Sequence, residues 1–134
     1  MKFLEKQAYG CNNIKLLVWI KNKDEFFKKI DIFFCSSYIE PFGLVILEAM
    51  LNGVPVISTK CKGPIDIIEH MKNGILVNID NKQEMEKAII LLEKDKLLRK
   101  QISKNAFETL KNKYSIQAYK KNLFTEIKKT YEKK

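Results

Sequence analysis

Two short apolar runs on either side of an apolar helical stretch constrain the fold of this 134-residue chain more than any other feature. Residues Ile30–Cys35 are apolar, β-branched and aromatic and end in serines, which predicts a buried strand that opens into a loop. Leu44–Leu51 predicts a helix that stops at Gly53, and Val54–Ser58 predicts a second buried strand. This order indicates an α/β fold with a parallel sheet flanked by helices, in which ligands bind at the carboxyl ends of the strands.

A glycine precedes the predicted helix and a carboxylate lies within it. The helix begins near Gly43, where free backbone N–H groups and the positive end of the helix dipole favour an anion, and a glycine lets a phosphate approach the backbone closely. Glu48 lies on the second turn of a helix that is otherwise apolar, so we expect its side chain to be largely buried and to need hydrogen-bond donors. Glu40 lies in the loop before the helix, on the same rim of the sheet.

Two interpretations of these three residues are open. Sugar hydroxyls are donors that suit both carboxylates, and a phosphate suits the start of the helix, so the set predicts a nucleotide sugar as the ligand. Alternatively, Glu48 pairs with a lysine, Glu40 is solvated and Gly43 only permits a turn.

The surrounding residues resemble a known family of enzymes. The run from Ser36 to Thr59 contains Ser-x-x-Glu-x-Phe-Gly-Leu, Leu-Glu-Ala-Met and Gly-x-Pro-Val-Ile, and seven residues separate Glu40 from Glu48. These motifs resemble those of the retaining glycosyltransferases of the family 4 type, which have two Rossmann-like domains in a GT-B fold and carry an E-x7-E motif. The resemblance implies that residues 1–134 are a carboxy-terminal domain that binds a nucleoside-diphosphate sugar.

The resemblance also implies a role for each matching residue. Glu40 is the catalytic candidate, because it would bind the hydroxyls of the donor sugar and steady the charge that develops at the anomeric carbon. Glu48 would bind the ribose hydroxyls. Backbone N–H groups for the sugar and the diphosphate would come from Phe42, Gly43, Leu44 and Val45. Such enzymes need no metal ion for diphosphate binding, so we expect neither a metal nor another cofactor.

The resemblance extends in both directions. Residues Lys15–Ile20 resemble the strand and turn whose backbone contacts the nucleotide base, which makes Trp19 and Ile20 the base-binding candidates, although Val18 stands where a glycine is usual. Downstream, Gly63–Glu69 and Asn73–Val77 resemble the next helix and strand of the family.

The length of the chain suits one domain with a core. The enzymes that it resembles also need an acceptor domain and, in the donor domain, a first strand with a glycine-rich loop and a basic pair. We therefore expect the chain to begin inside a domain, as a truncated frame, an excised piece or part of a split enzyme, and to be inactive alone. The implied reaction transfers a hexose or N-acetylhexosamine, with retention, to a glycan or lipid-linked acceptor in bacterial envelope polysaccharide synthesis.

Two other functions stay open. The chain could be a donor-binding or assembly module without activity, either a remnant or a subunit that completes a partner. The net charge of +9 suggests a nucleic-acid binder. The aromatic residues, however, fall on predicted core faces, and a single arginine provides little bidentate phosphate recognition, so we expect no nucleic acid partner.

Charge and cysteine usage bear on location. A net charge of +9 favours contact with anionic surfaces, such as the inner face of a membrane. Cys11, Cys35 and Cys61 show no pairing or metal-site spacing, which is typical of a reducing cytoplasm. Glu5 and Lys6 interrupt any signal-peptide core, and no apolar run is long enough to span a bilayer. We expect a cytoplasmic protein, with peripheral membrane contact as an open alternative.

The remaining predicted elements are helix Phe3–Tyr9, strand Ile14–Trp19, helix Asp24–Ile30, helix Pro64–His70, strand Ile75–Val77, helices Lys82–Lys94 and Lys96–Lys111, and a final helix from Ser115. Phe26, Phe27 and Ile30 should pack on the sheet. The final helix carries an apolar stripe, expected to be partly exposed or to lie on a membrane, formed by Ile116, Tyr119, Leu123, Ile127 and Tyr131.

Three further side chains have a functional and a simpler interpretation. Lys60 and Lys62 follow the second strand and could face a phosphate, but we favour two solvated lysines. His70 has no Ser, Asp or Cys nearby that would suggest a catalytic triad, so we expect a surface residue at the end of a helix.

Overall fold

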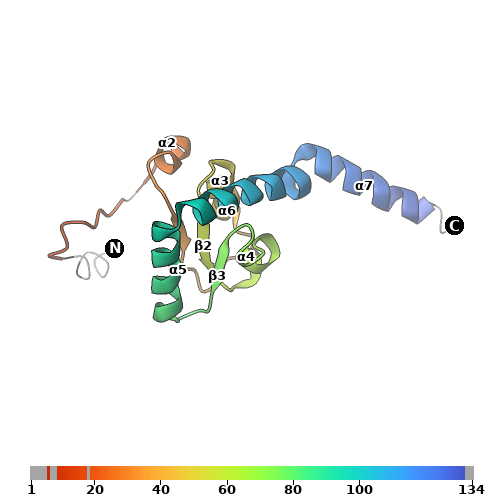
Figure 1. Ribbon diagram of the computed structural model, residues 1–134. Coiled ribbons are helices and arrows are strands. Elements are labelled where there is room, and N and C mark those ends of the chain that lie inside the picture. Colours follow the sequence, from red (N-terminus) through yellow and green to blue (C-terminus); the bar gives the residue numbers. More distant parts are fainter. Residues whose placement is uncertain (1–5, 7–8, 18, 132–134) are drawn as a thin grey trace.

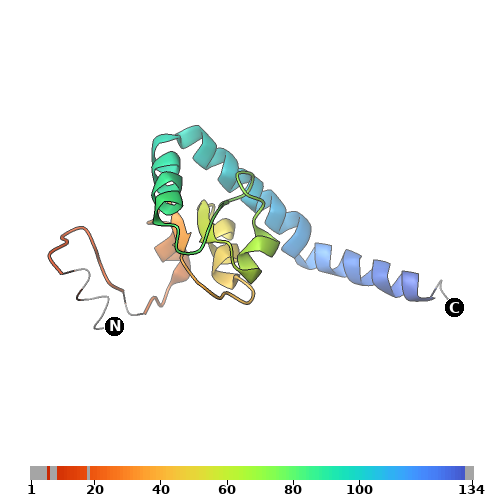
Figure 2. The ribbon, with the colours of Figure 1, turned by 90° about the horizontal axis from the view of Figure 1, so that it is seen from below.

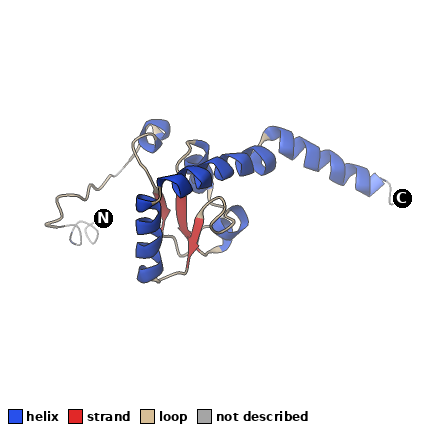
Figure 3. Cartoon of the chain, viewed as in Figure 1, coloured by secondary structure: helices blue, strands red, loops and turns tan. Residues whose placement is uncertain are grey.

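A three-stranded parallel sheet forms the centre of the protein. The computed structural model describes residues 6, 9–17 and 19–131. Strands β1 (Phe33–Cys35), β2 (Val56–Thr59) and β3 (Ile75–Val77) lie in that order across the sheet, as Figures 1 and 3 show. Both pairings are parallel, so all three strands end at the same edge.

Helices cover both faces of the sheet and continue beyond it. They are α2 (Lys23–Phe27), α3 (Leu44–Leu51), α4 (Lys62–Ile67), α5 (Lys82–Lys94), α6 (Lys96–Thr109), the π-helical turn η1 (Leu110–Tyr114) and α7 (Ile116–Tyr131). This arrangement confirms the expected α/β fold with a flanked parallel sheet and a helical carboxy terminus.

Side chains point alternately to the two faces of the sheet and so divide the core into two clusters. Val56 and Leu76 face α3 and α4 in one buried cluster, whereas their neighbours Ile57 and Ile75 face α5 in the other. This follows from the two-residue side-chain period of a strand that is buried on both faces. Helix α6 contributes to both clusters and packs against both α3 and α5.

Helix α7 extends away from the rest of the molecule, as the two views in Figures 1 and 2 show. Its expected apolar stripe is exposed at Ile116, Tyr119, Leu123 and Ile127, while the side chain of Tyr131 lies outside the described part. Among the described residues, no helix has the length and apolar character needed to cross a membrane.

Side chains cap the later helices where the sequence predicts. Asn81 Oδ1 accepts from the N–H of Glu84 at 3.1 Å, and Asp95 Oδ1 accepts from the N–H of Leu98 at 2.8 Å. These bonds satisfy N–H groups that have no partner within their own helix. The bounds of β3 and α5 agree with prediction, and Phe26, Phe27 and Ile30 pack on the core as expected.

The predicted strand Ile14–Trp19 is wrong. Residues 14–17 and 19 have no regular structure, and most are exposed. A strand needs a neighbour to bond its backbone, and within the described residues β1 pairs with β2 alone, so the outer edge of β1 is open. The predicted helix Phe3–Tyr9 lies almost entirely outside the described residues.

Several boundaries differ from prediction. Helix α2 ends at Phe27 rather than Ile30, and the strands on either side of α3 cover Phe33–Cys35 and Val56–Thr59. The helix predicted at Pro64–His70 is α4, which begins two residues earlier and ends at Ile67. Pro64 is harmless there because it lies in the first turn. The helix predicted to reach Lys111 becomes π-helical from Leu110.

Buried Asn73 explains why α4 ends early. Its side-chain oxygen accepts from the N–H of Glu69 at 2.7 Å, and its amide donates to the carbonyl of Ile67 at 3.2 Å and to Thr109 Oγ1 at 3.0 Å. The side chain therefore satisfies backbone groups at the end of α4 and ties them to α6.

Candidate functional site

Seven of the eight predicted site residues line one hollow beside the start of α3. The hollow has a volume of about 630 Å³. We call it the donor pocket; it is lined by Leu17, Trp19, Ile20, Lys23, Phe26, Phe27, Glu40, Pro41, Phe42, Leu44, Val45 and Glu48. Gly43, the eighth, is buried at the N-cap of α3. The walls are thus α2, α3, the loop after β1 and the segment around Trp19.

Neighbouring elements shape the loop between β1 and α3. The buried hydroxyl of Thr59, at the end of β2, donates to the carbonyl of Ser37 at 2.5 Å. The N–H of Gly63, in α4, donates to the carbonyl of Glu40 at 2.8 Å. Tyr38 donates its hydroxyl proton to Asp80, beyond β3, and this hydrogen bond raises the pKa of Tyr38. The loop is therefore held from β2, α4 and the loop that follows β3.

Gly63 was not predicted as a site residue. A Cβ at this position would lie 2.4 Å from the carbonyl oxygen of Glu40 and 2.7 Å from the carbonyl carbon of Phe42, so only glycine lets the loop approach α4 this closely. A signal was present in the sequence, since a glycine in the first turn of a short helix is otherwise unfavourable.

Gly43 sets the direction in which α3 leaves the loop. Its φ of 88° lies in the left-handed region, and a Cβ there would also meet Ile67 Cδ1 at 3.0 Å. Its N–H donates to Glu40 Oε1 at 3.0 Å. The next two N–H groups, of Leu44 and Val45, have no acceptor among the described residues and begin the helix beside the donor pocket.

Glu48 is less buried than the sequence predicts. Its side chain is 35% exposed, and Oε1 accepts a hydrogen bond from Lys23 Nζ at 2.6 Å. Glu48 is thus half-buried rather than largely buried as expected, because α3 is covered on one side only and Leu44 and Leu51 are 63% and 62% exposed. The pairing with a lysine, which the sequence left as an alternative, is present.

Trp19 and Ile20 lie at the margin of the donor pocket. Trp19 is 81% exposed, so its indole is open to solvent, and it lines the same pocket as the two carboxylates. Both predicted base-binding residues are thus brought to the same hollow as Glu40 and Glu48.

Lys60, Lys62 and His70 do not line the donor pocket. The two lysines are exposed, as expected for solvated side chains. His70 is exposed beyond the end of α4, and its Nδ1 accepts from the N–H of Leu76 at 3.1 Å. His70 therefore has a local structural role at the edge of the sheet.

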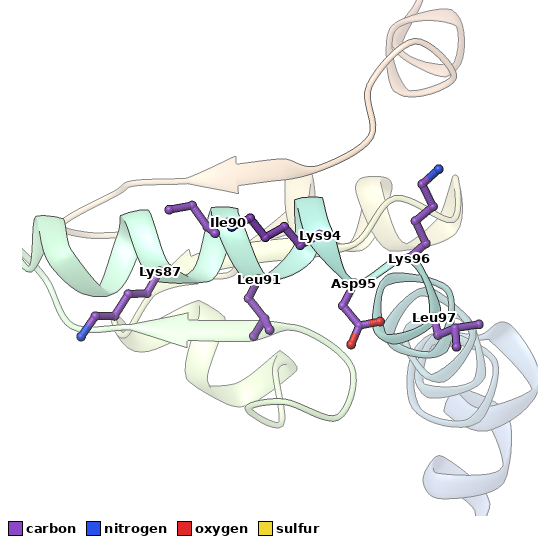
Figure 4. A pocket seen from close by; sticks show the side chains of 7 residues that line it. All are labelled: Lys87, Ile90, Leu91, Lys94, Asp95, Lys96 and Leu97. Atoms are coloured by element: carbon purple, nitrogen blue, oxygen red, sulfur yellow. The ribbon is translucent and has the colours of Figure 1, made fainter.

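A wider hollow, of about 730 Å³, lies at the turn between α5 and α6 and is shown in Figure 4. Its lining residues include Leu91, Leu97 and three lysines, but no residue of the donor pocket. Its one carboxylate, Asp95, already caps α6. We therefore place the candidate site in the smaller donor pocket.

Comparison with known proteins agrees with this geometry. The fold, a small three-stranded parallel sheet with helices on both faces, is that of the C-terminal domain of GT-B glycosyltransferases. Residues 2–109 match the family model "Glycosyl transferases group 1", and the chain belongs to this family.

Two named relatives are much longer than this chain. The lipopolysaccharide core biosynthesis glycosyltransferase LpsE of Rhizobium meliloti is 32% identical over 105 residues, which cover 78% of this chain and 31% of LpsE. Sucrose-phosphate synthase 1 of Arabidopsis thaliana is 35% identical over 83 residues, which cover 62% of this chain and 8% of the synthase. The chain thus spans about a third of LpsE and under a tenth of the plant enzyme.

Two solved structures show the same fold. The C-terminal domain of the glycosyl transferase LpcC from Francisella tularensis is 32% identical, with a TM-score of 0.73 over 86% of this chain and 60% of that one. HepE from Anabaena, solved in complex with UDP-glucose, is 26% identical, with a TM-score of 0.83 over 96% of this chain and 36% of HepE.

Proposed function

We propose that this chain is the carboxy-terminal, donor-binding domain of a retaining glycosyltransferase of the family 4 type and that it binds a nucleoside-diphosphate sugar in the donor pocket. The observation that carries the proposal is the placement of Glu40 and Glu48 in one hollow, with the first turn of α3 between them. Such a site has acceptors for sugar hydroxyls at two points and free N–H groups for an anion. The complex of HepE with UDP-glucose supports a uridine nucleotide as the first ligand to test.

Each residue has one task in this proposal. Glu48 accepts hydrogen bonds from the ribose hydroxyls, and Glu40 binds the hydroxyls of the sugar and stabilises positive charge at its anomeric carbon. The N–H groups of Leu44 and Val45 bind the diphosphate, joined by that of Gly43 once Glu40 turns from it toward the sugar, and the backbone of Phe42 contributes on the same rim. The exposed face of Trp19, with Ile20, receives the base.

The reaction in this proposal breaks the bond between the anomeric carbon and the diphosphate, which leaves with the electron pair. The oxygen of the acceptor hydroxyl bonds to the anomeric carbon on the face from which the diphosphate leaves, and its proton passes to a phosphate oxygen of the departing diphosphate, so the configuration is retained. Backbone N–H groups at the start of α3 compensate the charge of the diphosphate without a metal ion. Addition of a chelator should therefore leave nucleotide binding unchanged.

The rest of the proposal concerns the whole enzyme. The sugar is a hexose or N-acetylhexosamine, and the acceptor is a glycan or a lipid-linked saccharide of the bacterial envelope, which the similarity to LpsE supports. Acceptor binding comes from a further domain or chain, and the present chain alone binds the donor without turnover. The net charge of +9 supports work in the cytoplasm at the inner face of the membrane.

A donor-binding module without activity is the second candidate. The observation in its favour is that the Glu40 carboxylate accepts from Gly43 within its own loop instead of being free to bind a sugar. Mixing the chain with its candidate partner and assaying sugar transfer separates the two functions. Turnover in the mixture supports the transferase, and no turnover in any combination supports the inactive module.

Binding of a bare nucleotide tests the first proposal directly. Calorimetric titration of the wild-type chain with UDP and GDP should show binding of one of them, and Glu48→Ala should abolish it, because the ribose hydroxyls lose both acceptor oxygens. Glu86→Ala removes an exposed glutamate of α5 as a matched control. Unchanged affinity in Glu48→Ala would contradict the proposed role.

A further inference from the structure

One ion pair joins two of the helices that line the donor pocket. Lys23, the first residue of α2, places Nζ at 2.6 Å from Oε1 of Glu48 on α3. Two other ion pairs, those of Lys72 and Lys113, are made with Glu69, which does not line the pocket. Among the described residues, Lys23 is also the one cation in the lining, which it shares with Glu40 and Glu48.

The backbone that carries Lys23 is held firmly. Asn22 caps α2, since its Oδ1 accepts from the N–H of Glu25 at 3.1 Å. At the other end of α2, the buried ring of Phe27 packs edge-to-face on Phe33 of β1, with ring centroids 5.7 Å apart. The start of the Lys23 side chain is therefore held by a helix that is anchored to β1, within reach of Glu48.

The ion pair leaves room for a ligand on the same carboxylate. An ionised carboxylate can accept about four hydrogen bonds, and Lys23 uses one of them on Oε1. No donor among the described residues reaches Oε2. A ribose diol can thus bind Glu48 while Lys23 stays in place.

A ligand that covers the carboxylate changes the free energy that the ion pair contributes. With the Lys23 side chain 61% exposed and that of Glu48 35% exposed, the pair contributes little to the stability of the free protein. A nucleoside in the pocket excludes water from Glu48, and a covered carboxylate without a cation is strongly unfavourable. The ammonium group therefore matters most when the ligand is bound.

We propose that Lys23 is a positioning residue of the nucleotide site: it fixes the Glu48 carboxylate toward the ribose hydroxyls and balances its charge when the nucleotide covers it. This inference rests on the proposed binding of a nucleotide at Glu48. It assigns Lys23 to the nucleoside part of the ligand rather than to the diphosphate.

The test compares two ligands and several variants of the 134-residue chain by calorimetry. Lys23→Gln should weaken UDP and uridine equally, by about tenfold or more, as for loss of a hydrogen bond to a charged group. Lys23→Arg, which keeps the cation, should restore the affinity to within about threefold of wild type. Lys28→Gln removes an exposed charge at the other end of α2 and should have no effect. In a Glu48→Gln background, Lys23→Gln should cause no further loss.

Each other outcome overturns the inference. Suppose that UDP binds and that Glu48→Gln weakens this binding, but that Lys23→Gln has no more effect than Lys28→Gln. The nucleotide site then stands, and Lys23 has no part in it. Tighter binding in Lys23→Gln would show that Lys23 blocks the carboxylate. If Lys23→Gln weakened the affinity for UDP but not for uridine, Lys23 would interact with the diphosphate instead of the nucleoside. If the wild-type chain binds neither UDP nor GDP, the proposed function falls, and the inference falls with it.

Discussion

Glu40 has two hydrogen-bonding roles at the donor pocket. Its side chain accepts from the N–H of Gly43, and its carbonyl accepts from the N–H of Gly63. A sugar hydroxyl can replace the Gly43 N–H as the donor to the Glu40 side chain without any movement of the backbone. The bond to Gly63, in contrast, fixes the backbone position of Glu40. The residue is thus held in place by α4 and free to rotate toward a ligand.

Replacing Glu40 should separate the sugar from the nucleotide. Glu40→Ala should weaken binding of UDP-glucose more than binding of UDP, because only the intact donor carries the hydroxyls that Glu40 would accept from, and one such bond to a charged group is worth about 1.5 to 3 kcal/mol. Calorimetry on both ligands gives the ratio, with Glu86→Ala as the control for loss of a surface carboxylate. Equal losses for the two ligands would count against a sugar-binding role.

Gly63 offers a test of the loop geometry. Gly63→Ala places a Cβ against the Glu40 carbonyl, so we expect about 1 to 3 kcal/mol of destabilisation in urea unfolding, together with weaker UDP-glucose binding as the loop shifts. Lys62→Ala, at the preceding exposed position, should change neither measurement. If Gly63→Ala were as stable as wild type, the loop between β1 and α3 could move away from the added Cβ without loss of stability.

The sequence predicts which residues share the donor pocket better than it predicts how far each is buried. Glu40, Glu48 and Trp19 all line the donor pocket, and the loop with Glu40 follows the carboxyl end of β1, where ligands bind in parallel sheets. The exposure of Glu48 could not be predicted, because the covered side of α3 depends on elements distant in the sequence. The same holds for Lys23, whose neighbour lies 25 residues away.

At the scale of elements, local signals predict helices well and sheet pairing poorly. Helix α5 has its predicted bounds because Asn81 and the apolar spacing that follows specify its start and its buried side. The run Ile14–Trp19 has the composition of a strand, yet composition does not supply a neighbouring strand, and the outer edge of β1 stays open. Pairing is a long-range property that no local window contains.

Glu84 links the end of β3 to α5 and should make stability depend on pH. Its carboxylate accepts from the N–H of Asn78 at 2.7 Å and from the side-chain amides of Asn78 and Asn81. The Asn78 N–H, followed by lesser contributions from its side chain and from Lys60 and His70, lowers the pKa of Glu84 below its ordinary 4.5. With a folded pKa below the unfolded one, this contribution is present above the unfolded pKa and is lost as the pH falls through the folded pKa.

Glu84→Gln should therefore be less stable than wild type at neutral pH and approach it in acid. Urea unfolding at pH values of about 7, 5 and 3 measures the difference, which should shrink only below the ordinary pKa of 4.5. Glu86→Gln, an exposed neighbour in the same helix, should show no such trend. A constant difference across the three pH values would mean that the charge of Glu84 contributes nothing.

For the whole molecule, the excess of lysine is the dominant electrostatic feature. We expect co-sedimentation with phosphatidylglycerol vesicles at low salt, little with phosphatidylcholine, and release by about 0.5 M NaCl, since the Debye length falls from about 10 Å at 0.1 M to about 3 Å at 1 M. Sedimentation that persists at high salt would contradict a purely electrostatic contact and point to insertion of the exposed apolar stripe of α7.

Helix α6 gives the molecule a shared support. Ile102 belongs to the core on the α5 face and Ala106, one turn later, to the core on the α3 face. Loosening either face therefore disturbs the helix on which the opposite face also depends. Changes in the core beside α5 can therefore shift α6 and, through it, α3. Substitutions that stabilise the core on the α5 face must keep α6 in place if the donor pocket is to keep its shape.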